Sequence, residues 1–215
     1  MHPFKNIIFD LDGTLSNPID GILNSLRYAL QRLGIQNLPD SVPEEFIGPP
    51  LQHGFQTVFQ LDSEATHKAV AFFREYYGTK GLFENKIYEG IPELLVSLQA
   101  SGYRLFVATS KLEKYARLIL EHFGIDSCFF DLAGADYAGT RTKASLIVSL
   151  MEKHQLIKSE TVMIGDTAYD IMGAKQADIA VIAVGYGFGQ RENLLLNKPE
   201  HFLETTSELS AFFLN

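Results

Sequence analysis

Short apolar segments alternate with helix-periodic segments along most of this chain, and that alternation restricts the possible fold more than any other feature. It is typical of a mostly parallel sheet with helices on both faces. The predicted strands are apolar on both faces, as strands buried between two helical layers are. They span residues 4–9, 104–108, 128–133, 161–164 and 179–184. The sequence therefore predicts an α/β fold with a parallel sheet flanked by helices.

One long stretch, residues 16–86, contains no convincing strand. Apolar residues from Ile19 to Leu33 follow helical spacing until Gly34, and a second long helix is predicted at about 63–77. Four prolines divide the region between these helices into short pieces. We therefore expect two domains, an α/β core from residues 1–15 and 87–215 and an all-α domain from residues 16–86 inserted after the first strand.

The composition excludes several classes of protein. A formal net charge of -8 argues against a nucleic-acid partner, which requires clustered positive charge. The one cysteine, Cys128, excludes an intrachain disulfide and a cysteine-based zinc site. The N-terminal apolar run is too short for a signal peptide, and no segment is long enough for a membrane helix. We expect a soluble, cytoplasmic protein without a membrane partner, either a monomer or a weak homodimer.

Two carboxylates follow the first predicted strand. Asp10 and Asp12 precede Gly13-Thr14-Leu15, at the sheet edge where open α/β folds bind ligands. Because Asp-Gly also favours turns, the alternative is that both aspartates only shape a turn or cap the following helix.

A second acidic pair favours the functional interpretation. Asp166 follows the predicted strand 161–164, and Asp170 lies one helical turn further on. These acids could instead stabilise a helix N-terminus, an alternative that is strongest for Asp170. Three or four carboxylates at neighbouring strand ends would repel one another unless a cation neutralised them, and an all-oxygen ligand set suits Mg²⁺.

Hydroxyl and lysine residues supply the complementary anion-binding side. Thr109 and Ser110 directly follow the predicted strand 104–108 and precede a helix, whose N-terminus attracts phosphate. Lys143 opens another predicted helix, where a lysine opposes the helix dipole. Each also has an ordinary explanation, a helix cap for the hydroxyls and solvation for the lysine. Lys111 is expected on a positive rim together with other basic residues.

These motifs together resemble the haloacid dehalogenase superfamily, specifically its phosphatase branch with a small helical cap. The resemblance is carried by Asp-x-Asp-Gly-Thr-Leu at 10–15 and Gly-Asp-x-x-x-Asp at 165–170, with Thr109 and Lys143 in the family's order. It runs nearly end to end and implies a Rossmann-like core with a C1-type cap. By this resemblance, Asp10 is the nucleophile that forms an aspartyl-phosphate, and Asp12 is the general acid and base.

The resemblance also implies a metal site and a phosphate site. Mg²⁺ would be held by Asp10, the Asp12 backbone carbonyl and Asp166, with Asp170 in support. Thr109, the backbone around Ser110, and Lys143 would hold the phosphoryl oxygens that are not transferred. The presence of Asp12 excludes dehalogenases, which lack this second aspartate. Hydrolysis of a phosphate monoester is therefore favoured, with a phosphomutase and a non-catalytic binding protein as alternatives.

The inserted helical domain is expected to shape the leaving-group pocket. Segment 46–53, which includes Gln52 and His53, is the predicted substrate-contacting loop; a rigid connection between helices is the alternative. This Gly-Pro-Pro-Leu segment and residues 83–90 resemble phosphoglycolate phosphatase-like and 5′-nucleotidase-like proteins. The expected substrate is a small phosphorylated metabolite, either phosphoglycolate-like or a nucleoside 5′-monophosphate.

Overall fold

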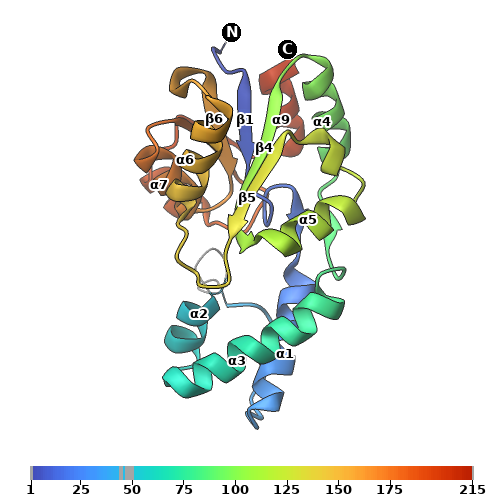
Figure 1. Cartoon of the computed structure of the whole chain (residues 1–215), viewed down its shortest axis with the longest axis vertical. Coiled ribbons are helices and arrows are strands. Elements are labelled where there is room, and N and C mark those ends of the chain that lie inside the picture. The colour runs from blue at the N-terminus through green and yellow to red at the C-terminus, as the bar shows by residue number, and fades with distance from the viewer. Residues whose placement is uncertain (1, 44–45, 47–50, 215) are drawn as a thin grey trace. The chain divides into compact units, whose positions relative to one another are not determined.

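The computed structural model describes residues 2–43, 46 and 51–214 (Figure 1). The chain divides into two compact units. One combines Met1–Ser16 with Ile87–Asn215, and the other is Asn17–Lys86. The chain crosses between them at β2 (Ser16–Asn17) and β3 (Lys86–Ile87), which form a small two-stranded sheet.

The first unit is built on a six-stranded sheet in the order β5-β4-β1-β6-β7-β8, in which every neighbouring pair is parallel. This arrangement confirms the predicted Rossmann-like α/β fold. The strands are β1 (Asn6–Phe9), β4 (Arg104–Leu112), β5 (Asp131–Ala135), β6 (Thr161–Gly165), β7 (Ala180–Val184) and β8 (His201–Leu203). The central strand β1 pairs with β4 on one side and β6 on the other, so the ends of these three strands meet at one edge.

Helices cover both faces of this sheet. Figure 1 shows α6 and α7 on one face and α4, α5 and α9 on the other. Buried apolar residues of α6 and α7 pack with alternate residues of the central strands, including Ile8, Phe106 and Met163. The helices are α4 (Ile91–Ala100), α5 (Glu113–His122), α6 (Lys143–His154), α7 (Ala168–Gln176), α8 (Arg191–Leu196) and α9 (Thr206–Leu214), with short 3₁₀ turns at Asp126–Cys128 and Lys158–Glu160.

Three details of this unit differ from the sequence-based expectation. β4 continues to Leu112 instead of ending at residue 108, because its pairing with β5 resumes after a register shift between Thr109 and Leu112. Cys128 belongs to a 3₁₀ turn, and β5 begins only at Asp131. β8 was not predicted, because its three residues are exposed or half-buried and lack a strand's apolar pattern.

The second unit is helical. It contains α1 (Ile19–Arg32), α2 (Leu51–Val58), α3 (Ser63–Tyr76) and a π-helical turn at Tyr77–Gly81. The apolar faces of α1 and α3 are buried, through Leu26, Ala29 and Leu30 on one helix and Ala69, Val70 and Phe73 on the other. Asp62 caps the N-terminus of α3, where its side chain accepts a hydrogen bond from the Ala65 backbone N–H at 2.8 Å. Among the described residues, no helix has the length and apolar character required to cross a membrane.

Candidate active site

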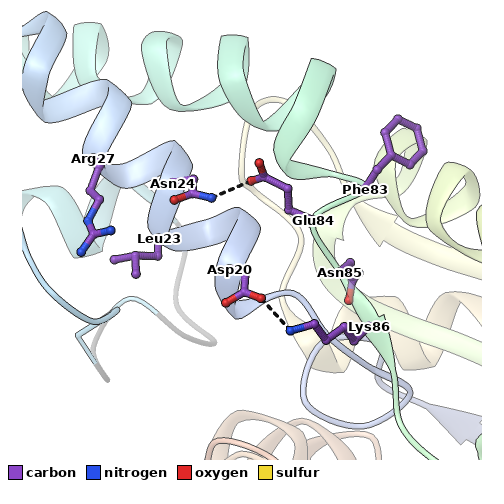
Figure 2. A pocket seen from close by; sticks show the side chains of 8 residues that line it. All are labelled: Asp20, Leu23, Asn24, Arg27, Phe83, Glu84, Asn85 and Lys86. Carbon is purple, nitrogen blue, oxygen red and sulfur yellow. Dashed lines mark hydrogen bonds and ion pairs between the residues drawn. The ribbon is translucent and has the colours of Figure 1, made fainter.

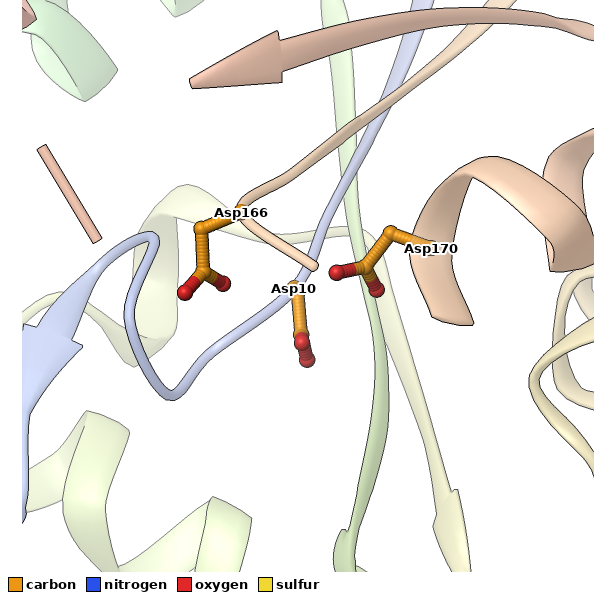
Figure 3. Close-up of side chains that lie close together, drawn as sticks. All are labelled: Asp10, Asp166 and Asp170. Atoms are coloured by element: carbon orange, nitrogen blue, oxygen red, sulfur yellow. The ribbon is translucent and has the colours of Figure 1, made fainter. Parts of the chain in front are cut away.

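Three buried aspartates meet where β1 and β6 end. Asp10 follows β1, Asp166 follows β6, and Asp170 lies in the first turn of α7. Each offers a carboxylate oxygen within 4.8 Å of the others. Figure 3 shows Asp10 between the other two. Asp10 is only 8% exposed, and Asp166 and Asp170 are fully buried. Adjacent parallel strands therefore bring together carboxylates that are 156 residues apart in sequence.

Asp166 is held by a hydroxyl, a backbone amide and two glycines. Thr14 Oγ1 donates to Asp166 Oδ1 at 3.2 Å, and the Phe188 N–H donates to Oδ2 at 2.8 Å. A Cβ atom at Gly13 would lie 2.0 Å from Asp166 Oδ2, and one at Gly187 would lie 2.3 Å from Asp166 Cβ. The loop that contains Gly187 therefore packs directly against this carboxylate, and only glycine permits so close an approach.

Asp170 caps α7 and also contacts Lys143. Its Oδ2 accepts hydrogen bonds from the Thr167 backbone N–H at 3.0 Å and the Thr167 hydroxyl at 2.8 Å, which completes the capping box of α7. Its Oδ1 lies 2.7 Å from Lys143 Nζ. The two interpretations of Asp170 left open by the sequence are therefore compatible, because each carboxylate oxygen serves one of them.

Lys143 places its ammonium group among the aspartates. Its Nζ lies 2.9 Å from Asp10 Oδ1, lies close to Asp170, and donates to the Ala108 carbonyl at 3.0 Å. The side chain is 5% exposed, so the lysine is not a solvated residue of the first helical turn. These contacts compensate for the unfavourable position of a cation at the N-terminus of α6.

The cluster concentrates negative charge away from water. Burial raises the pKa of Asp10 to about 7. The charge of Asp170 also raises this pKa, whereas the Lys143 ammonium lowers it. Burial also raises the pKa of Asp166 well above its usual range, and the charges of Asp170 and Asp10 add to this effect. For Lys143, burial alone would lower the pKa, but Asp10 and Asp170 outweigh burial and raise it. One ammonium does not balance three carboxylates, so the cluster fits an added hard cation such as Mg²⁺.

The other residues predicted for the core site lie around this cluster. Asp12 is half-buried and lies beside Lys111, with Nζ and Oδ2 separated by 2.8 Å. Thr109 is buried on β4, the strand that pairs with β1, and its hydroxyl accepts a hydrogen bond from the Lys111 N–H at 3.2 Å. Ser110 is exposed. The structure thus brings Asp10, Lys143 and the two β6-side aspartates into direct proximity, with Asp12 and Thr109 on the flanking elements.

Two site features were not predicted from the sequence. The contact of Asp166 with the Phe188 N–H is made by the backbone, so no residue type identifies it, although the surrounding glycines at 185–189 indicated a loop near the site. Tyr186 donates from its hydroxyl to the Thr14 carbonyl at 3.0 Å and packs edge-on against Tyr88. Burial raises the pKa of both tyrosines, so their hydroxyl groups stay protonated at physiological pH.

The predicted cap contacts belong to the helical unit. Gln52 and His53 lie in the first turn of α2, where Gln52 is half-buried and His53 is exposed. Residues 47–50 of the same predicted loop lie outside the described residues. The role of this segment in substrate binding stays a prediction.

The helical unit also contains a pocket of about 500 Å³ (Figure 2). Four of its polar side chains pair with one another: Lys86 pairs with Asp20 at 2.9 Å, and Asn24 donates to Glu84 at 3.0 Å. The aspartate cluster, with its unbalanced charge, is therefore the better candidate for chemistry. The pocket is lined by Asp20, Leu23, Asn24, Arg27, Phe83, Glu84, Asn85 and Lys86.

The fold and the carboxylate cluster define a class of α/β protein with an acidic site at the edge of a parallel sheet. Comparison with known proteins identifies the family. Residues 7–184 match the family described as haloacid dehalogenase-like hydrolase. The chain belongs to this family, which confirms the resemblance inferred from the motifs.

Several relatives are named for phosphate chemistry. The chain is 42% identical over 200 residues to a 5′-nucleotidase from Pseudomonas aeruginosa, covering 93% of this chain and 90% of the relative. It is 35% identical to the tyrosine-protein kinase PtkA of Mycobacterium tuberculosis (86% and 64% covered) and 29% identical to a phosphoglycolate phosphatase from Vibrio parahaemolyticus (95% and 94%). A predicted phosphatase from Clostridium acetobutylicum superposes with a TM-score of 0.92 at 37% identity, over 98% of both chains. Family and relatives together support a phosphatase.

Proposed function

We propose that this protein is a Mg²⁺-dependent phosphatase that hydrolyses small phosphate monoesters through a phosphorylated Asp10. The observation that carries the proposal is the position of Asp10, which lies beside Lys143 and between two further buried carboxylates. A nucleophilic carboxylate, an ammonium group and a set of oxygen ligands are the parts that phosphoryl transfer requires.

In the first half-reaction, an Asp10 carboxylate oxygen attacks the phosphorus atom and the bond from phosphorus to the ester oxygen breaks. The leaving oxygen takes a proton from Asp12 and departs as an alcohol. Asp12 follows Asp10 by two residues, in a loop where Gly13 adopts a φ of 83° that permits the tight turn. The proposed nucleophile and proton donor therefore belong to one short loop at the end of β1.

In the second half-reaction, water attacks the phosphorus atom of the aspartyl-phosphate. The Asp12 carboxylate takes a proton from that water, the bond between phosphorus and the Asp10 oxygen breaks, and inorganic phosphate is released. Asp10 returns as a carboxylate and Asp12 is protonated again, so both residues are regenerated. Lys143, whose pKa is raised by Asp10 and Asp170, stays charged throughout and stabilises the negative oxygens of the phosphoryl group.

The proposal also assigns the metal and phosphate ligands, and the clustering of Asp10, Asp166 and Asp170 supports it. The residues that would hold Mg²⁺ are Asp10, the Asp12 backbone carbonyl, Asp166 and Asp170, and those that would hold the phosphoryl oxygens are Thr109, Ser110 through its backbone, and Lys143. When bound, Mg²⁺ neutralises charge on the phosphoryl oxygens and on the carboxylates. Thr14 and the Phe188 N–H keep the Asp166 carboxylate in place.

The proposed substrate is a small phosphorylated metabolite, either phosphoglycolate or a nucleoside 5′-monophosphate. The names of two relatives support this choice. Gln52 and His53 of the helical unit are proposed to contact the leaving group. Because the reacting phosphate is the same in every such substrate, selection has to come from contacts to the rest of the molecule.

The test is phosphate release from a panel of phosphoglycolate, nucleoside 5′-monophosphates, sugar phosphates and an aryl phosphate. Each is assayed with Mg²⁺, with EDTA, and with the Asp10→Asn variant. Release that requires Mg²⁺ and is lost in Asp10→Asn supports the proposal. Release that persists in Asp10→Asn refutes the proposed nucleophile, and turnover that requires a bisphosphate primer without net phosphate release indicates a phosphomutase.

A further inference from the structure

Lys111, a second lysine with a buried side chain, forms an ion pair with the half-buried Asp12. Its Nζ lies 2.8 Å from Asp12 Oδ2, and its side chain is only 7% exposed. A lysine on a positive rim would be solvated, as the exposed Lys114 of α5 is. Burying a lysine side chain is unfavourable unless its charge is compensated, so the pair with Asp12 explains where this side chain lies.

The irregular end of β4 produces this placement. The pairing of β4 with β5 shifts between Thr109 and Leu112, so Lys111 lies in the irregular segment. The Thr109 hydroxyl accepts a hydrogen bond from the Lys111 N–H at 3.2 Å, which fixes the backbone there. Bulges commonly re-aim a side chain next to an active site, and here the re-aimed side chain reaches Asp12.

The two oxygens of Asp12 have different surroundings. Oδ2 faces the Lys111 ammonium, whereas Oδ1 is buried and has no hydrogen-bond partner within the part of the chain that the structure describes. A buried carboxylate oxygen without a partner in the protein is unfavourable, and a catalytic role is one of the explanations for such an atom. The pairing thus distinguishes one oxygen of Asp12 from the other.

We propose that Lys111 is a positioning residue that holds Asp12 through Oδ2, so that Oδ1 gives the proton to the leaving oxygen and later takes the proton from water. This inference rests on the proposed function and extends it to a residue outside the Asp10 and Lys143 cluster. It assigns the two lysines separate tasks, since Lys143 contacts the nucleophile and Lys111 contacts the proton donor.

Leaving groups of different basicity test this role. Formation of the aspartyl-phosphate from an alkyl phosphate requires protonation of a basic alkoxide, whereas p-nitrophenolate leaves without a proton. The ratio kcat/KM reports this half-reaction. Lys111→Met is expected to lower kcat/KM by about 10- to 100-fold for phosphoglycolate or a nucleoside 5′-monophosphate, whichever is turned over. For p-nitrophenyl phosphate the expected loss is less than about threefold. Lys114→Met, a matched change at an exposed lysine, is expected to match wild type with both substrates.

Two further variants separate positioning from a general structural role. In an Asp12→Asn background, Lys111→Met is expected to cause no additional loss of kcat/KM for the alkyl substrate, because the group that it positions no longer transfers a proton. Lys111→Cys alkylated with 2-bromoethylamine restores the ammonium and is expected to recover most of the alkyl-phosphate activity, with identically treated wild type as the control.

Equal losses of kcat/KM for both substrates would overturn the inference, as would a rise in KM alone, which indicates substrate binding. In either case, Asp10-dependent release by the wild-type protein would leave the proposed function intact. If the wild-type protein releases no phosphate in an Asp10-dependent manner, both the proposed function and this inference are refuted.

Discussion

Replacing Lys143 with methionine is expected to destabilise the metal-free protein strongly. The ammonium lies 2.9 Å from Asp10 and 2.7 Å from Asp170, and the lysine side chain is 5% exposed. Removing one partner of a buried ion pair costs about 3–5 kcal/mol, because the remaining charge stays buried and uncompensated. For a chain of this size the cost corresponds to a fall in Tm of roughly 6–20 °C. Protonation of Asp10, whose pKa burial already raises to about 7, favours the lower end of this range.

The assay is thermal unfolding in EDTA, monitored by circular dichroism. Lys153→Met is the matched control, since Lys153 lies on the same helix and pairs with Asp131 at 2.7 Å but is 67% exposed. Because the Lys153 ammonium is solvated, its pair with Asp131 is expected to contribute at most about 1 kcal/mol, so the control loses no more than about 4 °C. Added Mg²⁺ is expected to recover part of the loss in Lys143→Met. If the two variants have the same Tm, the electrostatic description of the cluster is wrong.

Three further results are expected. Saturating Mg²⁺, at about 100 times its Kd, is expected to stabilise the protein by about 2.7 kcal/mol, which raises Tm by roughly 5–10 °C. A calorimetric scan should show this rise in Asp178→Asn, a change at an exposed aspartate, but not in Asp166→Asn. Gly187→Ala places a Cβ atom 2.3 Å from Asp166 Cβ, so titration calorimetry should show Mg²⁺ binding weakened about 10- to 100-fold; unchanged affinity would contradict this packing. The pKa of Asp131 is lowered to about 2, because hydrogen bonds from His154, Lys153 and the Leu132 backbone outweigh the effect of burial. The Asp131 carboxylate therefore stabilises the folded protein above about pH 4, and this stabilisation is lost as the pH falls toward about 2. Asp131→Asn should cost about 1 kcal/mol near neutral pH in urea unfolding, with a difference from wild type that shrinks below about pH 4 rather than above it.

The Asp10 and Asp166 pair shows what the sequence predicts well. Each residue follows a short apolar strand, and parallel strands end at a common edge, so their proximity follows from topology alone. For Lys143 the position of a cation in the first turn of a helix was only a weak signal, and its role in the site was implied by the family resemblance.

The role of Lys111 shows where sequence reasoning ends. It depends on the register shift in β4, which arises from pairing with a strand some twenty residues away and leaves no periodic signal in the sequence. The contact of Asp166 with the Phe188 N–H cannot be predicted from residue types either, because every residue except proline carries a backbone N–H.

The central claim is that Asp10 carries the phosphoryl group during turnover. The most direct test is rapid acid quenching of the protein during turnover of a radiolabelled substrate, followed by peptide mapping. We predict that the label is recovered on the peptide that contains Asp10, and that Asp10→Asn carries none. Turnover without labelled protein, or label on a different residue, would contradict the mechanism.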